Sequence, residues 1–316
     1  MRRTLLAMLV LAVALAAAAA FAPGWLAFLL AVVMAKSLVV AGLVVMWRAG
    51  LISFGQALFY GVGAYGAGML GMRWGVTDFF LITLVGAATA GVIAWVLGFL
   101  VARYRGIFFA NLNLAFSMLL FGYMVKSSTF GGTDGLRAPI PTFLGYEPGD
   151  ATRVGVLLVA TTAVVLPLLA LLHRFLDSTA GRMTTAIRDN EIRVLYLGGS
   201  VRRTIHLLVV VAAVLAGAGG AMVALAIGHI DPDVAYWTTS GEFLFVAVLA
   251  GPAHVLAAVL GTSVFEVIRT YANEYAPQFW QLILGTSLVL SMLFLPDGLW
   301  SLAGRLRRVR KEAGHV

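Results

Sequence analysis

Polar side chains that could bind or guide a solute stand at a few positions inside long apolar blocks. Six of them lie in the blocks 50–71 and 106–125, namely Ser53, Gln56, Tyr65, Asn111, Asn113 and Ser117. A hydroxyl or amide group is costly in an apolar environment unless a hydrogen-bond partner replaces the lost water. These side chains therefore either bond neighbouring helices or face a polar passage. Both interpretations stay open, and the six residues are our candidates for a substrate pathway.

The residue types that catalysis and metal binding require are absent or scattered. The chain has no cysteine, which excludes thiol nucleophiles and thiolate metal ligands. No two of its five histidines stand at i,i+4, and neither a phosphate-binding GxxxxGK[ST] loop nor a G-x-S-x-G elbow occurs. We therefore expect no enzyme, no catalytic residue, no metal site and no cofactor.

Ionisable side chains inside the apolar blocks are rare. Glu266 is the main candidate, and Arg269 follows one helical turn later. An ion-coupled carrier usually needs a relay of such groups within the membrane, so one glutamate is thin support for that mechanism. The chain is expected to take its energy from elsewhere.

A polar and basic stretch, residues 177–206, separates two long apolar blocks. Its centre, residues 183–197, is predicted as one short amphipathic helix, capped by Ser178 or Thr179 and ended by Gly198-Gly199. The stretch is either a solvated loop with a surface helix or a coupling helix that docks a cytoplasmic motor onto the membrane part.

Side-chain spacing supports this helix. Three apolar residues share one of its faces, namely Met183, Ile187 and Val194. Opposite charges stand at i,i+3 and i,i+4, in the pairs Arg188–Glu191 and Asp189–Arg193.

Composition indicates an all-α polytopic membrane protein. The 316 residues are 61% hydrophobic and 11% charged, whereas a soluble domain has about 25% charged residues. The apolar blocks are near the length that a membrane-spanning helix requires, and the short alternating segments of a membrane barrel are absent. The net charge of +8 gathers at the ends of apolar blocks, which fits membrane orientation rather than nucleic-acid binding. One transmembrane domain, residues 1–316, is the simplest organisation.

We expect about ten transmembrane helices, some short or broken. Plain inspection finds nine apolar blocks: 1–22, 26–46, 50–71, 78–101, 106–125, 154–172, 207–227, 243–268 and 281–295. The first resembles a signal peptide, although we favour a retained span. Two cytoplasmic termini require an even number of crossings, and Gly251-Pro252 is the expected place where the eighth block divides.

The block 50–71 contains seven glycines. Gly61, Ala64, Gly68 and Gly71 lie along one helical face, and such small-residue faces let helix backbones approach closely in lipid. Ser53 and Gly55 could also break the helix and leave polar backbone to line a cavity.

Charge predicts the orientation. Arginines concentrate at the amino terminus, in residues 103–105, in the loop 174–206 and in the basic tail 304–316. These segments should be cytoplasmic, so both termini should be too. The segments 126–153 and 228–242 carry more acidic residues and fit the other side.

Six motifs in one order resemble the membrane subunits of ABC importers for branched-chain amino acids, specifically the M-type permease of LIV systems. They are GLISFGQALFYGVGAYGAGML (50–70), FFANLNLAFSMLL with GGTDGL (108–136), GRMTTAIRDNEIRVLYLGGSVRRTIHL (181–207), AGAGGAM (216–222), the segment that ends at Ser240 and Glu242, and FLPDGLW (294–300). Two departures stand out: Asn111 replaces a common threonine, and Ala250-Gly251 replaces a Gly-Gly pair. They leave the substrate open among branched-chain amino acids, urea, aromatic amino acids and small organic acids.

The resemblance implies a subunit of a bacterial inner-membrane transporter that forms half of the translocation pathway. Its implied partners are a second homologous permease, two ABC ATPases that use the ATP, and a periplasmic substrate-binding protein. The residues implied to couple to an ATPase are Arg182, Ile187, Arg188, Asn190, Glu191 and Gly198, and Thr133 and Asp134 would face the binding protein. The alternatives are an ion-coupled secondary carrier and a membrane-embedded enzyme or scaffold.

Overall fold

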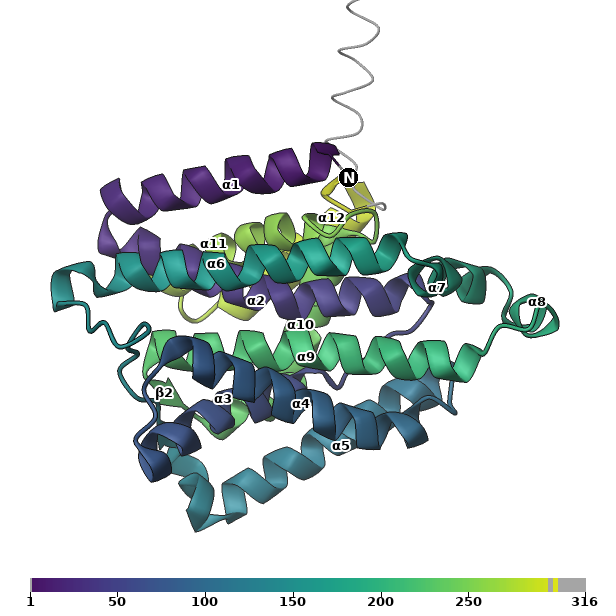
Figure 1. Ribbon diagram of the computed structural model, residues 1–316, viewed down its shortest axis with the longest axis horizontal. Coiled ribbons are helices and arrows are strands. Elements are labelled where there is room, and N and C mark those ends of the chain that lie inside the picture. Colours follow the sequence, from purple (N-terminus) through teal and green to yellow (C-terminus); the bar gives the residue numbers. More distant parts are fainter. Residues whose placement is uncertain (1, 295–297, 301–316) are drawn as a thin grey trace, which may run out of the picture.

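The computed structural model describes residues 2–294 and 298–300 and is almost entirely helical (Figure 1). Ten helices of 14 residues or more make up the body: α1 (Arg2–Phe21), α2 (Gly24–Arg48), α3 (Gln56–Trp74), α4 (Phe79–Val101), α5 (Gly106–Lys126), α6 (Asp150–Asp177), α9 (Val201–Ile227), α10 (Trp237–Ala250), α11 (Ala257–Tyr275) and α12 (Trp280–Phe294). Two short helices, α7 (Thr179–Asp189) and α8 (Glu191–Tyr196), lie at one end of the body.

The prediction of an all-α polytopic membrane protein is confirmed. Among the described residues, six helices are long and apolar enough to cross a membrane, namely α1, α2, α4, α5, α6 and α9. Helices α10 and α12 are shorter apolar helices, and α3 and α11 are not among the candidate spans. The number of ten crossings therefore stays a prediction. The basic tail 304–316 lies outside the described residues.

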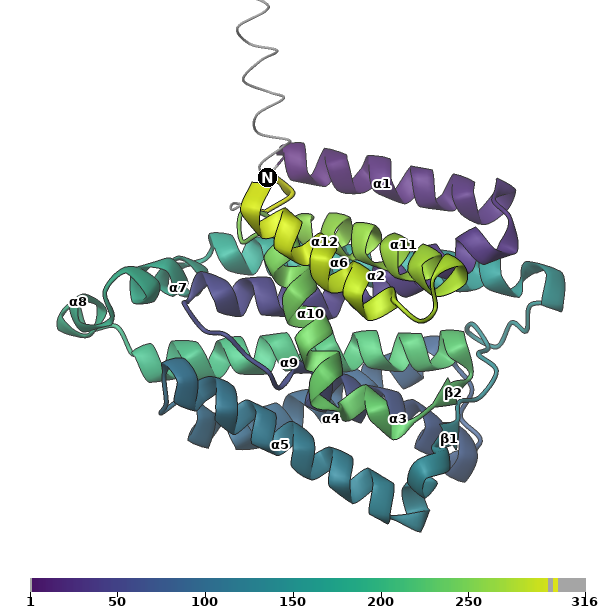
Figure 2. The ribbon, with the colours of Figure 1, turned by 180° about the vertical axis from the view of Figure 1, so that it is seen from behind.

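Helix α9 is the centre of the body, and α2, α3 and α4 pack around it (Figures 1 and 2). Its patch of small residues, 216–221, is buried throughout. A side chain at Gly63 of α3 would collide with the carbonyl of Gly217, and one at Gly220 would collide with the carbonyl of Tyr60. Glycine at these positions lets the two backbones touch.

The glycine face predicted for α3 is only partly right. Gly61, Gly68 and Gly71 do sit in close contacts, but they meet Ala235, Ile230 and Pro139 of the segments 228–242 and 126–153 rather than another long helix. The closest backbone contacts with α9 are made by Tyr60 and Gly63, which the predicted face leaves out. Because α3 is enclosed on several sides, spacing alone does not tell which neighbour each side meets.

Both predicted helix breaks are confirmed. Residues 50–55 are not helical, and α3 begins only at Gln56. In the eighth block, α10 ends at Ala250, where Gly251 has a φ of 82°, and α11 begins at Ala257. The positive φ suits glycine, because it lacks the Cβ that would clash there.

The single helix predicted over residues 183–197 is wrong. Ser178 caps α7 as expected, since its hydroxyl accepts the Gly181 N–H at 3.3 Å. Asn190, however, leaves the helical conformation, and its side-chain oxygen accepts the Arg193 N–H at 2.9 Å. This cap starts the separate helix α8, because asparagine bonds to backbone groups more readily at a helix start than in its interior. The apolar positions Ile187 and Val194 are both buried, as their shared face required.

A short two-stranded sheet lies at the end of the body opposite α7 and α8. Strand β1 (Leu136–Arg137) pairs antiparallel with β2 (His229–Ile230), and the turns η1 (Ser128–Phe130), η2 (Gly132–Asp134) and η3 (Pro232–Ala235) surround it. These elements bring together the two segments that were assigned to the same side of the membrane, 126–153 and 228–242.

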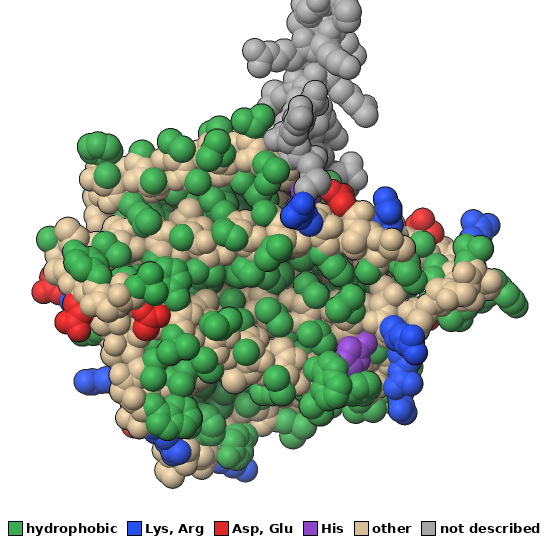
Figure 3. Space-filling model, viewed as in Figure 1, with side chains coloured by type: hydrophobic (Ala, Val, Ile, Leu, Met, Phe, Trp, Pro, Cys, Tyr) green, Lys and Arg blue, Asp and Glu red, His purple; other side chains and the backbone are tan. Residues whose placement is uncertain are grey.

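The two ends of the body differ in charge. Arginines of the α4–α5 turn and of α7, α8 and the start of α9 gather at one end, and acidic side chains gather at the other (Figure 3). Helix α1 also begins toward the α7 end (Figure 1). This asymmetry agrees with the predicted orientation, which itself stays a prediction.

Candidate functional site

The start of α3 is a polar junction between three parts of the chain. Ser53 precedes it, and its hydroxyl accepts the Gly55 N–H at 3.2 Å. Ser240 of α10 accepts the Ala57 N–H at 2.9 Å and so satisfies a free donor of the helix end. A Cβ at Gly55 would lie 2.8 Å from the Cβ of Asn113 of α5. The broken segment therefore allows α3, α5 and α10 to meet at one point.

Three of the predicted pathway residues form bonds within the protein. Ser53 bonds the broken segment, Asn113 donates its amide to the Phe109 carbonyl at 2.8 Å, and Ser117 donates its hydroxyl to the Ala235 carbonyl at 2.8 Å. All three are buried. These contacts favour helix packing over a polar passage for these three residues, because each side chain forms a hydrogen bond inside the fold.

Two other predicted pathway residues have polar atoms without a hydrogen-bond partner in the described structure. The Gln56 side-chain oxygen and the Tyr65 hydroxyl are both buried, and the Gln56 amide reaches only the Met46 sulfur, at 3.4 Å. A buried polar group without a partner calls for an explanation such as a water or a solute. The structure places Gln56 beside the junction, whereas Tyr65 stacks edge-on against Phe130 nearer the β1–β2 end.

The sixth pathway candidate, Asn111, is exposed on α5 rather than turned into the body. Its side chain therefore points away from the body. The structure does not bring it together with the junction at the start of α3.

Four charged side chains form two ion pairs inside the helical body. Lys36 of α2 lies 2.6 Å from Glu266 of α11, and both side chains are largely buried, with 14% and 9% of their surface exposed. Arg269 of α11 lies 3.1 Å from Glu242 of α10 and 5.8 Å above the ring of Trp280. Sequence analysis found Glu266 and Arg269 but missed Lys36. The sequence feature that could have revealed Lys36 is its position as a lone lysine in the middle of the apolar block 26–46.

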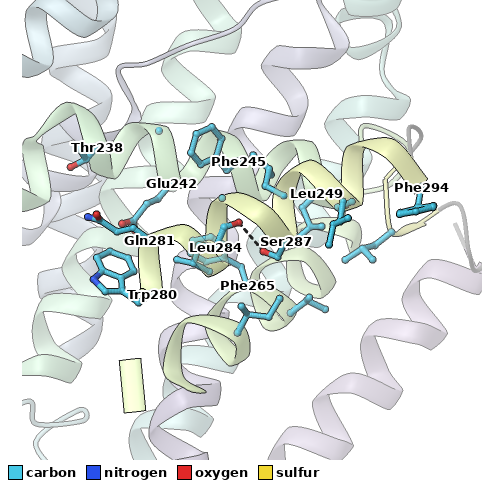
Figure 4. Close-up of a pocket in the computed structure, with 18 of the residues that line it drawn as sticks. Thr238, Glu242, Phe245, Leu249, Phe265, Trp280, Gln281, Leu284, Ser287 and Phe294 are labelled. Carbon is cyan, nitrogen blue, oxygen red and sulfur yellow. Dashed lines mark hydrogen bonds between the residues drawn. The ribbon is translucent and has the colours of Figure 1, made fainter. Parts of the chain in front are cut away.

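A pocket of about 550 Å³ lies between α10, α11 and α12. Thr238, Glu242, Trp280 and Gln281 are found at one end of it, and Phe294 lies at the other (Figure 4). Between them the wall is mostly apolar, with Phe245, Leu249, Phe265 and Leu284, and Ser287 also lines it. The pocket therefore has a largely apolar wall and a carboxylate, that of Glu242, at one end.

Helix α8 stands out from the rest of the molecule (Figure 1). Its buried Val194 packs it against the body, and the bond from the Gly199 N–H to the Val194 carbonyl, 2.9 Å, closes its carboxyl end. Four large apolar side chains on or just after it are exposed, namely Ile192, Leu195, Tyr196 and Leu197. Sequence analysis missed this apolar tip because it assumed one continuous helix and followed only the buried face.

The residues predicted to meet an ATPase differ in how far they are exposed. Arg182, Arg188, Asn190 and Gly198 are exposed at the α7–α8 end. Ile187 of α7 is buried, so it packs this helix against the body and is not available to a partner. Glu191 is partly buried and forms an ion pair with Arg105. At the opposite end of the body, Thr133 and Asp134 are exposed in the η2 turn.

Comparison with known families decides the identity. The family described as the permease component of the branched-chain amino acid transport system matches residues 26–292. The chain belongs to this permease family. The match covers every described helix after α1 except the first two residues of α2 and the end of α12, and so includes the junction, the ion pairs, α8 and most of the pocket.

Two curated relatives of this permease are the high-affinity branched-chain amino acid transport system permease proteins LivM of Salmonella typhimurium and Escherichia coli. They are 31% identical to it over 283 and 285 residues, respectively, which is 81% of this chain and 65% of each relative. The permease thus spans about two thirds of their length. No solved structure matches it.

Proposed function

We propose that this permease is one of two membrane subunits of an ATP-driven ABC importer, and that it forms half of the pathway for branched-chain amino acids or a related small solute. The family match supports the transport role. The observation that carries the coupling role is α8, whose exposed apolar tip stands at the basic end of a chain without a nucleotide-binding loop.

The proposed partners follow from the surfaces. Helix α8 would insert its exposed Tyr196 and Leu197 into a groove of an ATPase subunit, with the exposed Arg182 and Arg188 of α7 at the rim. An interface with an apolar centre and a polar rim is typical of stable protein contacts. The importer would contain two ATPases, one for each membrane subunit.

The contacts of α7 and α8 suggest how motion would reach the membrane. Helix α7 follows α6 directly and packs on α6 and α9, and α8 is joined to the α4–α5 turn by the Arg105–Glu191 pair. A shift of the ATPase would therefore move several long helices together, because packed helices transmit rigid-body motion. The opposite end, with Thr133 and Asp134 exposed, would receive a periplasmic binding protein.

The second permease subunit would cover the apolar surface of helices such as α5, which is mostly exposed in the single chain. Asn111 would then face the pathway between the two subunits. In this proposal the protein lies in a bacterial inner membrane and has both termini in the cytoplasm.

The test is co-purification followed by uptake. The tagged chain is isolated from its native host, its partners are identified, and the complex is reconstituted into vesicles with leucine, urea, phenylalanine or a small organic acid. Recovery of an ATPase and a second permease, with ATP-dependent uptake, is the expected result. Uptake by the chain alone that follows an ion gradient would instead show a secondary carrier.

A further inference from the structure

An open groove of about 550 Å³ lies on the outside of the body where α4 and α9 pack together, toward the end that carries α7 and α8. Helix α4 contributes Trp95 and Phe99 to it, and α9 contributes Arg202, Arg203 and His206. Figure 3 shows arginine, histidine and apolar side chains side by side on this part of the surface. The groove therefore combines cationic side chains with aromatic ones.

The two arginines of the groove are available to an anion. Both are exposed, and neither forms an ion pair with any of the described residues. A guanidinium has five N–H donors, and Arg202 uses one of them to bond the Phe99 carbonyl at 3.0 Å. This bond holds the Arg202 side chain against the end of α4. A phosphate group suits such a site, because guanidinium groups bind phosphate oxygens in pairs.

A stripe of apolar residues continues along α9 from the arginines. Leu207, Val210 and Val214 follow Arg203 at helical spacing, and all of them are at least partly exposed on a helix that is otherwise largely buried. A second groove, of about 240 Å³ and lined only by apolar residues of α6 and α9, adjoins the first, since Val210 lines both. The cationic end therefore leads into a continuous apolar track.

The length of this track matches one leaflet of a bilayer. Helix α9 is one of the candidate membrane spans. An α-helix rises about 1.5 Å per residue, so Arg203 and Val214 lie about 16 Å apart along its axis. The hydrocarbon core of a bilayer is about 30 Å thick, and the track therefore covers about half of it. A lipid with its headgroup at the arginines would place one acyl chain along the whole stripe.

We propose that the two grooves bind an anionic phospholipid in the leaflet next to the α7–α8 end. Its phosphate lies between the guanidinium groups of Arg202 and Arg203, and one acyl chain follows the apolar stripe of α9. Trp95, which is 55% exposed, lies against the glycerol region, because tryptophan side chains favour the membrane interface. Basic pockets between membrane helices are suited to anionic headgroups of this kind.

The combination of charge and apolar length distinguishes this ligand from others. A zwitterionic phospholipid brings its own ammonium group close to the arginines and gains less from them. A free phosphate or a soluble phosphate ester uses the cationic end alone and leaves the apolar track empty. An acidic surface of a partner protein would bond the exposed arginines but would not follow the stripe into the membrane.

The headgroup contact is tested by native mass spectrometry of the delipidated full-length chain, titrated with phosphatidylglycerol or with phosphatidylcholine of the same acyl chains. The wild type should bind phosphatidylglycerol at least tenfold more tightly. Arg202→Gln with Arg203→Gln should reduce this preference to within threefold. The matched control is Arg73→Gln with Arg137→Gln, because these exposed arginines lie in α3 and β1, at the other end of the body, and their loss changes the net charge equally. The control should keep the wild-type preference.

The acyl-chain contact is tested with a variant that fills the track. Val210→Trp places a large side chain where the two grooves meet, so it should weaken binding of phosphatidylglycerol at least fivefold. Leu84→Trp is its control, because Leu84 of α4 is 66% exposed and lines neither groove. Melting temperatures within a few degrees of the wild type would show that all four variants are folded, since each changed side chain is at least partly exposed.

Four results would overturn the proposal. One is equal affinity of the wild type for the two lipids, and another is an equal loss of preference in both double-arginine variants, which would show attraction by overall charge alone. The third is unchanged lipid binding in Val210→Trp together with full displacement of the lipid by glycerol phosphate, which would show a site for soluble anions. The fourth is a co-purified subunit that shields both arginines from phenylglyoxal and leaves no lipid bound, which would assign them to a protein contact.

Discussion

The guanidinium of Arg105 and the carboxylate of Glu191 meet in two parallel hydrogen bonds, Nε to Oε2 and Nη2 to Oε1, each 3.1 Å long. Arg105 directly precedes α5, and Glu191 is the first residue of α8. The pair therefore ties the turn between two membrane helices to the exposed helix that is proposed to receive the motor. Two-point contacts of this kind fix orientation as well as distance.

Substitution of Glu191 should uncouple ATP hydrolysis from transport. In Glu191→Lys the two cations would repel each other, and α8 would lose its fixed position relative to α5. We expect normal membrane insertion and ATP hydrolysis by the complex, with uptake per ATP reduced about tenfold. Parallel measurements of phosphate release and uptake in proteoliposomes test this. The exchange Arg105→Glu with Glu191→Arg should recover part of the coupling, and normal coupled uptake in Glu191→Lys would refute the assignment.

Loss of the apolar tip of α8 should weaken assembly with the ATPase. Tyr196 and Leu197 are 89% and 81% exposed, so Tyr196→Ser with Leu197→Ser should leave the thermal stability of the isolated chain unchanged. We expect at least tenfold weaker binding of the ATPase subunit in a pull-down from detergent. Leu144→Ser is the matched control, because Leu144 is equally exposed, at 82%, but lies at the other end of the body. Equal ATPase recovery from both variants would contradict the role of α8.

A larger residue at the centre of α9 should destabilise the protein. A side chain at Gly217 would collide with Ala90 and with the carbonyl of Gly86, both on α4. Overpacking of a dense contact costs typically about 1–3 kcal/mol, so Gly217→Val should lower the melting temperature in detergent by several degrees or prevent accumulation. Gly122→Val, where a Cβ meets no atom within 4 Å, should melt as the wild type does.

Removal of one partner of the Lys36–Glu266 pair should be more harmful than removal of both. Lys36→Met leaves the carboxylate of Glu266 buried without its counter-charge, and loss of a buried pair in this way costs about 3–5 kcal/mol. In the double variant Lys36→Met with Glu266→Met no charge is left behind, so its melting temperature should lie above that of either single variant. A double variant that melts below both would show that the pair itself stabilises the fold.

Replacement of Gln56 tests whether the junction at α3 belongs to the pathway. The Gln56 side-chain oxygen is buried without a partner, so Gln56→Leu removes an unsatisfied group and should keep or raise the melting temperature. If Gln56 contacts the passing solute, uptake should fall about tenfold in the same variant. Wild-type uptake together with unchanged stability would assign Gln56 to packing alone.

Most of the helical organisation could be read from the sequence, because it depends on local properties. Runs of apolar residues fix which segments leave water, and the breaks at residues 50–55 and at Gly251 follow from residues that interrupt a helix or require a positive φ. The amphipathic stretch after α6 was recognised in the same way. Its division at Asn190 was missed, because an asparagine can either continue a helix or cap the next one, and only the surrounding contacts select between them.

The candidate sites needed the tertiary structure, because they join residues that are distant in sequence. Lys36 meets Glu266 across 230 positions, and Arg105 meets Glu191 across 86. Neither pair leaves a pattern in a single sequence. The same holds for the pocket, where Glu242 of α10 and Gln281 of α12 lie at one end. Apolar spacing shows that each helix must be buried. It does not show which neighbour each helix packs against, because the apolar faces of the helices are nearly equivalent. The close approach at Gly63 and Gly217 and the charges inside the body make that choice.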